Sequence, residues 1–331
     1  MNTIHIIFTV SLISVFLLTV LFTRLIIPKL KSMKLGQTIL EIGPRWHKSK
    51  EGTPTMGGVA FISASLLVAA VVIAIMVTLL DYTLPATLIV TLIFAAVNGA
   101  IGVIDDMTKF KNHRNEGLSA SQKFLLQLLS AGIYLFVLVR LGAITTVMHI
   151  PFTSIGIDLG FVYYPVALII ITGIINSVNL TDGIDGLASS VTMVAGAAFA
   201  VISFLIANTD LTVLSALVIG ACLGFLTYNF YPARIFMGDT GSLFLGALVV
   251  GCAFIMNDPL ISLIIGIIYV IESFSVILQV GSFKLTHKRI FKMSPIHHHF
   301  EKCGWSEIRI VSVFSIVTLI VSTIAVILTI I

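Results

Sequence analysis

Long apolar segments alternate with short polar loops along almost the whole chain. Ten segments are apolar enough and long enough to cross a bilayer, since a helix rising about 1.5 Å per residue needs about 20 residues to span roughly 30 Å of hydrocarbon. They cover residues 3–27, 57–80, 84–104, 122–142, 162–178, 186–206, 211–229, 241–256, 259–280 and 307–331. The pattern predicts an all-α polytopic integral membrane protein with ten transmembrane helices, in which residues 1–331 form a single domain.

The composition agrees with this interpretation. The chain has 331 residues, of which 58% are hydrophobic and 10% charged, and its mean hydropathy is +1.11. Soluble domains are nearer a quarter charged, so this chain is suited to lipid rather than water. No basic residue precedes the first apolar segment and no small-residue cleavage site follows it, so we expect a retained helix and not a signal peptide. The three cysteines predict no disulfide framework.

Lysine and arginine lie almost entirely on one side of the predicted membrane. With ten spans, one side receives four loops that hold 17 of the 19 basic residues, namely 28–56, 105–123, 230–240 and 281–309. The positive-inside rule places these loops in the cytoplasm and both chain termini outside. The net charge of +4 therefore reflects topology, and it gives no reason to expect a nucleic-acid partner.

One connection on the opposite side is longer than a turn. It runs from Ala143 to Phe161 and contains the stretches TTVMHI and SIGIDLG around Pro151. Alternating apolar and polar residues around a proline turn predict a short β-hairpin on the outer surface.

Two aspartates in the stretch SVNLTDGIDGLAS (residues 177–189) have no neighbouring cation. No Lys or Arg lies within forty residues of Asp182 or Asp185. A carboxylate without a basic partner favours a divalent metal as its partner. The alternative is a polar turn between two membrane helices, in which Asn, Thr, Asp and Gly are ordinary residues.

A second acidic pair, Asp105 and Asp106, ends the third predicted span. Adjacent helical residues point about 100° apart, so we expect one of the two to serve a metal or act as a base while the other does something else. The alternative is that they end the span at the headgroup level and pair with the basic residues that follow, Lys109, Lys111 and Arg114.

The loop YPARIFMGDTGS (residues 231–242) leads into the eighth predicted span. A glycine-rich helix start offers free N–H groups to phosphate, yet Asp239 would repel phosphate unless a cation bridges them. The loop is not a Walker loop, because its lysine is missing. We therefore expect five aspartates to meet in one cytoplasmic cleft with basic residues around them, namely Asp105, Asp106, Asp182, Asp185 and Asp239. Such a cleft is typical of phosphoryl transfer between anionic partners.

The last cytoplasmic loop contains SPIHHHFEKCGW, with three consecutive histidines at 297–299. Adjacent histidines rarely converge on one metal ion, so we favour hydrogen bonds to phosphate or sugar over a metal site or a solvated turn. Glu272 lies inside the ninth span, where a carboxylate is costly, and we expect it to face the bundle interior. The sequence leaves open whether it serves function or only pairs with a polar neighbour.

Taken together, five stretches resemble a known family. They are GPRWHKSKEGTPTMGG (43–58), the Asp105–Asp106 pair, NSVNLTDGIDGLA (176–188), YNFYPARIFMGDTGSL (228–243) and SPIHHHFE (294–301). The resemblance is to the phospho-N-acetylmuramoyl-pentapeptide transferases, which belong to the polyprenyl-phosphate N-acetylhexosamine-1-phosphate transferase superfamily. It covers nearly the whole chain and implies an enzyme of peptidoglycan synthesis in the bacterial cytoplasmic membrane, often a homodimer. Such enzymes use Mg²⁺ to move phospho-MurNAc-pentapeptide from UDP-MurNAc-pentapeptide to undecaprenyl phosphate, giving lipid I and UMP.

The resemblance also implies roles for particular residues. Asp105 and Asp106 match the essential pair of the family, Asp239 matches its Mg²⁺-binding residue, and His298 is expected to be catalytic. Phe236 is expected to stack on the uracil, and Lys123 to provide a cation for phosphate. The other expected substrate-binding residues are Lys50, Thr55, Asn176, Asn179, Asp182, Asp185, Asn229, His297 and His299.

Two alternatives remain at this stage. A sister transferase would use UDP-N-acetylglucosamine, but the stretches TPTMGG and PIHHHFE resemble the muramoyl-pentapeptide branch. A membrane transporter would place ionisable residues near the bilayer midplane, whereas these aspartates lie at the ends of spans.

Overall fold

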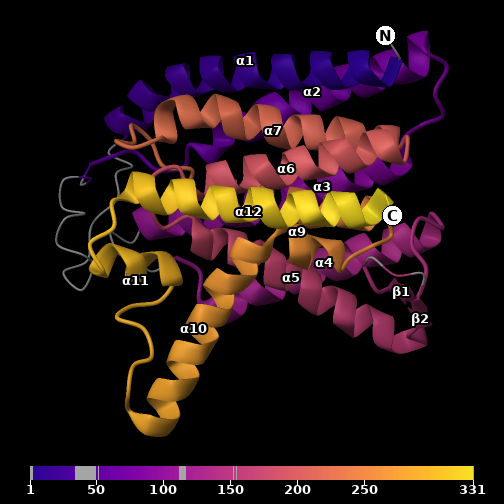
Figure 1. Ribbon diagram of the computed structural model, residues 1–331. Helices are drawn as coiled ribbons and strands as arrows, with labels where there is room; N and C mark the ends of the chain where they lie inside the picture. Colours follow the sequence, from indigo (N-terminus) through magenta and orange to yellow (C-terminus); the bar gives the residue numbers. More distant parts are fainter. Residues whose placement is uncertain are drawn as a thin grey trace.

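The computed structural model describes residues 3–33, 50, 52–111, 117–151, 153 and 155–330 (Figure 1). Within these residues, ten helices are long and apolar enough to cross a membrane, which confirms the predicted number. They are α1 (Thr3–Ser32), α2 (Gly58–Leu79), α3 (Ala86–Lys111), α4 (Ala120–Arg140), α5 (Tyr163–Thr181), α6 (Leu187–Leu205), α7 (Thr209–Asn229), α8 (Gly238–Ile255), α10 (Ile267–Thr286) and α12 (Glu307–Ile330).

Three of these helices form the centre of the bundle. Helices α6, α7 and α8 are the most buried of the ten. Helix α8 packs against α3 and α5, and α7 packs against α1 and α6. Helices that are apolar all round in this way belong in the interior of a bundle, where neighbouring helices replace the lipid.

Two predicted boundaries were wrong in ways that matter for the site. The third span was expected to end at residue 104, but α3 continues to Lys111, so Asp105 and Asp106 lie within a helix. Ion pairing along the last turns, where Lys109 reaches Asp105 at i,i+4, favours this polar extension. The predicted ninth span is split at Gly266 into the short helix α9 (Ile261–Ile265) and α10, since Gly266 has non-helical dihedral angles. Helix α10 then slants away from the bundle (Figure 1).

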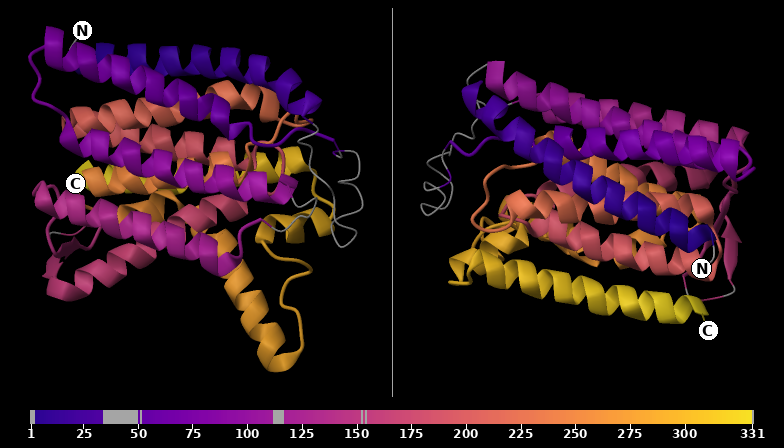
Figure 2. Two further views of the ribbon diagram at one scale, coloured as in Figure 1. Left: turned by 180° about the vertical axis from the view of Figure 1, so that it is seen from behind. Right: turned by 90° about the horizontal axis from the view of Figure 1, so that it is seen from above.

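The two ends of the chain lie at the same end of the bundle (Figures 1 and 2). The predicted β-hairpin is also at this end, as two antiparallel strands, β1 (Val147–His149) and β2 (Gly156–Asp158), and a 3₁₀ helix at Gly160–Val162 precedes α5. The opposite end carries the short helix α11 (Ile296–Lys302), which the hydrophobic pattern did not predict.

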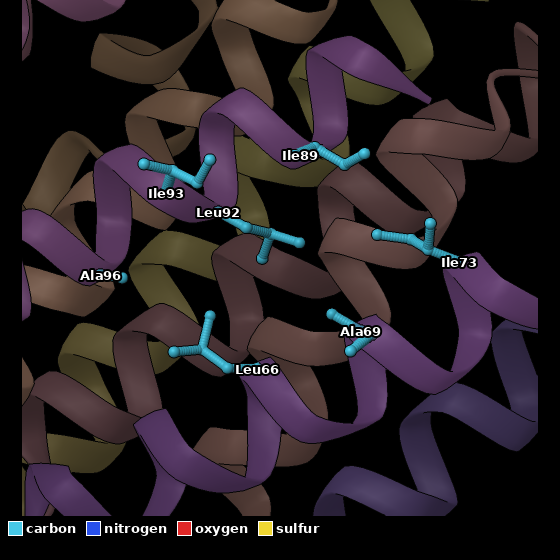
Figure 3. Close-up of a pocket in the computed structure, with 8 residues that line it drawn as sticks. Leu66, Ala69, Ile73, Ile89, Leu92, Ile93 and Ala96 are labelled. Atoms are coloured by element: carbon cyan, nitrogen blue, oxygen red, sulfur yellow. The ribbon is translucent and has the colours of Figure 1, made fainter. Parts of the chain in front are cut away.

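An apolar pocket of about 420 Å³ lies between α2 and α3 (Figure 3). Its walls are made of side chains such as Leu66, Ile73, Ile89 and Leu92. No side chain that lines it can carry charge or donate a hydrogen bond. The chemistry of this protein must therefore be sought elsewhere, at the end of the bundle that holds the aspartates.

Candidate active site

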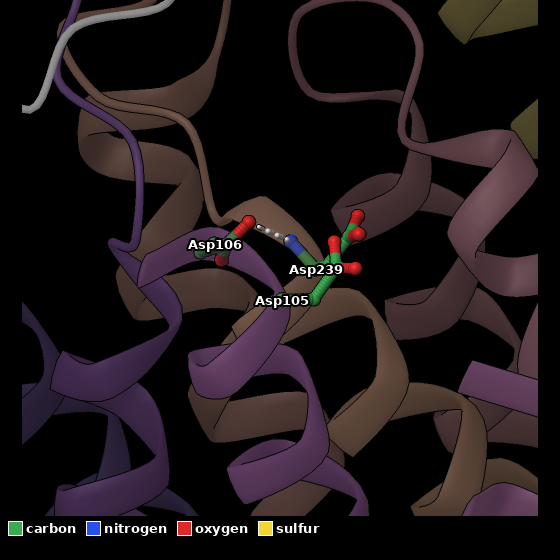
Figure 4. A group of neighbouring side chains, drawn as sticks. All are labelled: Asp105, Asp106 and Asp239. Atoms are coloured by element: carbon green, nitrogen blue, oxygen red, sulfur yellow. Dashed lines mark hydrogen bonds between the residues drawn. The ribbon is translucent and has the colours of Figure 1, made fainter. Parts of the chain in front are cut away.

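Three aspartates meet where α3 and α8 pack together (Figure 4). One carboxylate oxygen from each of Asp105, Asp106 and Asp239 lies within 4.8 Å of the others. We expected one of Asp105 and Asp106 to serve a metal while the other does something else, but carboxylate oxygens of both belong to this group. Helix α8 begins beside this part of α3, so both side chains can turn toward its first residues despite their different directions from the helix.

Asp106 binds the N-terminus of α8. Its Oδ2 accepts hydrogen bonds from the Thr240 backbone N–H (3.0 Å) and the Thr240 hydroxyl (2.7 Å), and its Oδ1 accepts one from the Asp239 N–H (3.2 Å; Figure 4). The first N–H groups of a helix lack intrahelical partners and carry partial positive charge, so a carboxylate is well placed there. Asp106 thereby fixes the position of Asp239 relative to α3.

Gly238 makes this contact possible. It opens α8 with a φ of +71°, a conformation that residues with side chains rarely adopt. A Cβ atom at this position would also lie 2.5 Å from Asp106 Oδ2 and 2.9 Å from the Thr55 hydroxyl. Thr55 therefore lies next to the acidic cluster, as a residue of the expected substrate cleft should.

Two lysines neutralise the cluster. Lys109 Nζ lies 2.7 Å from Asp105 Oδ2, 2.7 Å from Asp239 Oδ2 and 3.8 Å from Asp106 Oδ1. Lys123 Nζ lies 2.7 Å from the same oxygen of Asp239. The ion pair expected at the end of the third span is thus present for Lys109, and it includes an aspartate from another helix.

Lys123 is positioned by the start of α4. The Ser119 hydroxyl accepts from the Gln122 N–H and the Gln122 side chain accepts from the Ser119 N–H, which is a capping box. Lys123 follows in the first turn and also donates to Asn179 Oδ1 at 3.3 Å.

Asn179 holds the remaining oxygen of Asp239. Its amide donates to Asp239 Oδ1 (2.7 Å) and to the Ser242 hydroxyl (2.8 Å). Asn176, one turn earlier on α5, instead donates to Gln127 Oε1 (2.6 Å). The structure therefore brings Asn179 into the acidic cluster and places Asn176 against α4.

Asp185 has a basic partner after all. Its Oδ1 accepts from Lys50 Nζ at 2.6 Å, and its Oδ2 accepts from the Ala233 N–H at 2.8 Å. Glu307 Oε2 accepts from the same Lys50 ammonium (2.6 Å) and from the Asp185 N–H (3.0 Å). The absence of a nearby cation in the sequence was misleading here, because Lys50 comes from a distant part of the chain.

Asp182 directly follows α5, and its carboxyl group interacts electrostatically with the acidic cluster. Burial raises the pKa of its carboxyl well above the usual range, and the negative charges of Asp239, Asp106 and Asp185 raise it further. Of the five aspartates expected to converge, three could share one ion, Asp182 feels their charge, and Asp185 is held by Lys50.

The loop that carries Phe236 pairs with the segment after Lys50. The Phe236 N–H donates to the Pro54 carbonyl (2.8 Å), and the Gly57 N–H donates to the Phe236 carbonyl (2.8 Å). Asn229, at the end of α7, donates to the Ile235 carbonyl at 2.9 Å and so shapes the same loop. Thr55, Asn229 and Phe236 thus lie on neighbouring segments that hydrogen bonds hold together.

The three histidines have three different partners. His297 Nδ1 lies 3.0 Å from Glu272 Oε1, His298 Nδ1 lies 2.6 Å from Glu301 Oε2, and His299 Nδ1 accepts from the Lys292 N–H at 3.1 Å. They lie on helix α11 with His297 fully buried, so the alternative of a solvated turn was wrong. Glu272 is buried and faces the bundle interior, where it contacts His297.

His297 supports the turn that contains Asp182 and Asp185. Its Nε2 atom has no hydrogen-bond partner among the described residues, and it faces Gly183 so closely that a Cβ atom there would collide with the ring. The absence of a side chain at Gly183 therefore lets the turn lie directly on the Glu272–His297 pair.

We expect Gly183→Ala to lower the free energy of unfolding by about 2 kcal/mol, because the new methyl group must displace the buried ring. Thermal unfolding of the purified protein measures this. Gly173→Ala, in α5, is the matched control, since a Cβ atom there meets nothing within 4 Å. Equal melting temperatures for the two variants would contradict the contact.

Four residues at the site were not expected there from the sequence, or were given a smaller role. Lys109 was considered only as a partner for the end of a span, and Thr240, Glu301 and Glu307 were not singled out. Lys109 had a local signal, because it follows Asp105 and Asp106 at helical spacing. Glu301 had one too, because it follows His298 at i,i+3, whereas Thr240 and Glu307 become visible only when the helices are packed together.

This arrangement can be compared with known proteins. Residues 87–257 match the family described as Glycosyl transferase family 4, and residues 50–62 match the phospho-N-acetylmuramoyl-pentapeptide-transferase signature 1. The first match includes the acidic cluster, and the second includes Lys50 and Thr55.

Whole proteins are also similar to this chain. A phospho-N-acetylmuramoyl-pentapeptide-transferase of Clostridioides difficile (strain 630) is 44% identical over 320 residues, which cover 96% of this chain and 97% of the relative. The protein of the same name from Clostridium acetobutylicum is 47% identical over 317 residues, covering 95% of this chain and 96% of the relative. That from Clostridium novyi (strain NT) is 46% identical over 311 residues, covering 94% and 93%. The similarity therefore extends over the complete bundle and is not confined to one motif.

Proposed function

The chain belongs to the phospho-N-acetylmuramoyl-pentapeptide transferase family, and we propose that it transfers phospho-MurNAc-pentapeptide from UDP-MurNAc-pentapeptide to undecaprenyl phosphate. The products are lipid I and UMP. The observation that carries this proposal is the cluster of Asp105, Asp106 and Asp239 with two lysine ammonium groups, at one end of a membrane-spanning bundle. Both substrates bring phosphate to the site, and one of them arrives from the bilayer.

The donor set fits Mg²⁺. Three carboxylate oxygens within 4.8 Å of one another are the hard ligands that Mg²⁺ takes in phosphoryl-transfer sites. We assign Asp239 as the principal ligand, with Asp105 and Asp106 beside it. When bound, Mg²⁺ supplies positive charge that offsets the charge developing on the departing UMP.

We assign different roles to the two adjacent aspartates. Asp106 uses both carboxylate oxygens to hold the start of α8, so it is a positioning residue for Asp239. Asp105 accepts from the Leu118 N–H with one oxygen, and its other oxygen pairs with Lys109. Asp105 is therefore the better base for the monoanionic form of the lipid phosphate, which then attacks the sugar-linked phosphorus directly.

We assign the donor nucleotide to the region where the Phe236 loop pairs with the segment after Lys50. Phe236 stacks on the uracil, with Asn229 and the Lys50–Asp185 pair shaping this end of the pocket. His298 acts on the donor from α11. The remaining proposed substrate-binding residues are Thr55, Lys123, Asn176, Asn179, Asp182, His297 and His299.

Measurement of UMP release from UDP-MurNAc-pentapeptide tests the proposal. Purified protein should release UMP only when undecaprenyl phosphate and Mg²⁺ are both present. UDP-N-acetylglucosamine as donor should give none. Release from that second donor alone would instead indicate the sister reaction, and no release from either would contradict a transferase.

The orientation that we propose puts the acidic cluster on the cytoplasmic face. Cys303 lies in the loop between α11 and α12 and is exposed, whereas Cys222 and Cys252 are buried. We expect a membrane-impermeant thiol reagent to label Cys303 in inverted vesicles but not in intact cells. Cys303→Ser is the control for labelling at other sites. Labelling of Cys303 in intact cells would show that this loop faces outward, opposite to the proposed orientation.

A further inference from the structure

Lys109 occupies the centre of the acidic cluster. Among the residues that the structure describes, it is the cation that contacts all three carboxylates, at 2.7 Å from Asp105, 2.7 Å from Asp239 and 3.8 Å from Asp106. Lys123 contacts only one of them, Asp239. One ammonium group thus offsets part of the repulsion among all three neighbouring carboxylates.

A divalent cation cannot join this arrangement unchanged. Asp239 Oδ2 already accepts from both lysines, and its Oδ1 accepts from Asn179, so little lone-pair capacity remains. Mg²⁺ would bind these oxygens at about 2.1 Å, which is closer than an ammonium group approaches. The ammonium of Lys109 would then lie beside a doubly charged ion, and the two positive charges would repel each other.

The Lys109 side chain is also exposed enough to move away from the carboxylates. It is 33% exposed, compared with 15% for Lys123, and it lies near the end of α3. A long, flexible lysine side chain can reach a second position without any change in the backbone.

We propose that Lys109 holds the cation position in the ligand-free protein and exchanges partners when substrate binds. The ammonium gives up its place beside Asp239 to a divalent cation and then binds a phosphate oxygen of the incoming nucleotide diphosphate. The exchange leaves a cation beside the carboxylates in both states, and the released ammonium gains an anionic partner in the phosphate. The inference rests on the proposed function only in taking the donor to be a nucleotide diphosphate bound together with a divalent cation.

Mn²⁺ binding to the full-length protein in lipid nanodiscs, followed by electron paramagnetic resonance, tests the exchange without any turnover. Lys109→Gln should bind Mn²⁺ about tenfold more tightly than the wild type, since its competitor is gone. Lys109→Arg keeps the charge and should bind no more tightly than the wild type. Lys123→Gln should gain less than Lys109→Gln, because Lys123 contacts one carboxylate and not three.

A second measurement follows the ammonium to its new partner. UDP binding at saturating Mn²⁺, measured by calorimetry, should be about tenfold weaker for Lys109→Gln than for the wild type, because the phosphate loses a charged hydrogen bond. A lysine that only stabilised the free protein would leave UDP binding unchanged. Unchanged or weaker Mn²⁺ binding by Lys109→Gln, or unchanged UDP binding, overturns the proposal.

Two controls separate the possible failures. If Asp239→Asn binds Mn²⁺ as the wild type does, the proposed metal site is wrong and not merely the exchange. If Lys109→Gln does not fold without metal, the proposal requires that Mn²⁺ restores its folding and that its melting temperature depends on Mn²⁺ more steeply than that of the wild type. A Lys109→Gln protein that stays unfolded in saturating Mn²⁺ counts against the exchange.

Discussion

Replacing Asp239 with asparagine is expected to reduce UMP release on the order of a thousandfold while the protein stays folded. The carboxylate of Asp239 accepts from both lysines and from Asn179, and it belongs to the group that could hold Mg²⁺. An amide cannot replace it, because the NH₂ group would face donors and the ligand charge would be lost. Initial rates measured over a range of Mg²⁺ concentrations give the effect and its metal dependence.

The matched control for this variant is Asp81→Asn. Asp81 is exposed in the turn after α2 and has a φ of +54°, which asparagine tolerates well, so this protein should keep full activity. Both variants should elute and melt like the wild type. Wild-type activity of Asp239→Asn at low Mg²⁺ would mean that the metal is held elsewhere.

The sequence was sufficient for the number of spans, because apolar length alone decides whether a helix can cross a bilayer. It was not sufficient for their ends. Helix α3 continues for two turns beyond its apolar part, where Lys109 pairs with Asp105, and hydropathy does not register such a polar extension. The break at Gly266 was equally hidden, since glycine is common within membrane helices and only packing determines where one bends.

The aspartates of the site could be found from the sequence, but their partners on other helices could not. Asp182 and Asp185 stood out because no cation lies near them in the chain. Yet Lys50, 135 residues earlier, binds Asp185. Glu307 joins the same group from the start of α12. Such contacts depend on which helices become neighbours, and one sequence carries no signal for that.

The two adjacent aspartates should respond differently to the same substitution. In Asp106→Asn, one amide group must face the Asp239 N–H, the Thr240 N–H and the Thr240 hydroxyl, and its own NH₂ cannot accept from any of them. The start of α8 then loses a partner, so the melting temperature should fall together with activity. The loss of activity relative to wild type should be the same at every pH.

In Asp105→Asn the loss of activity should depend on pH while the melting temperature changes little. A phosphate monoester has a second pKa near 6, so about half of the lipid phosphate needs a base at pH 6, about nine tenths needs one at pH 5, and almost none needs one at pH 8.5. If Asp105 is that base, the loss of activity should be about tenfold larger at pH 5, and about twofold larger at pH 6, than at pH 8.5. Each rate is divided by the wild-type rate at the same pH, so titration of Asp182, which both proteins share, largely cancels.

The same experiment distinguishes direct attack from a covalent mechanism. If Asp105 were a nucleophile forming a phospho-MurNAc-enzyme, no pH would restore activity to Asp105→Asn, because the dianionic lipid phosphate could not replace the missing carboxylate. Incubation of wild-type protein with UDP-MurNAc-pentapeptide alone would then yield labelled protein by mass spectrometry. Direct attack predicts no such species, because the phosphorus passes from the donor to the lipid phosphate in one step. A loss of activity that narrows as pH rises, together with unlabelled protein, therefore identifies Asp105 as a base that becomes unnecessary once the lipid phosphate is dianionic.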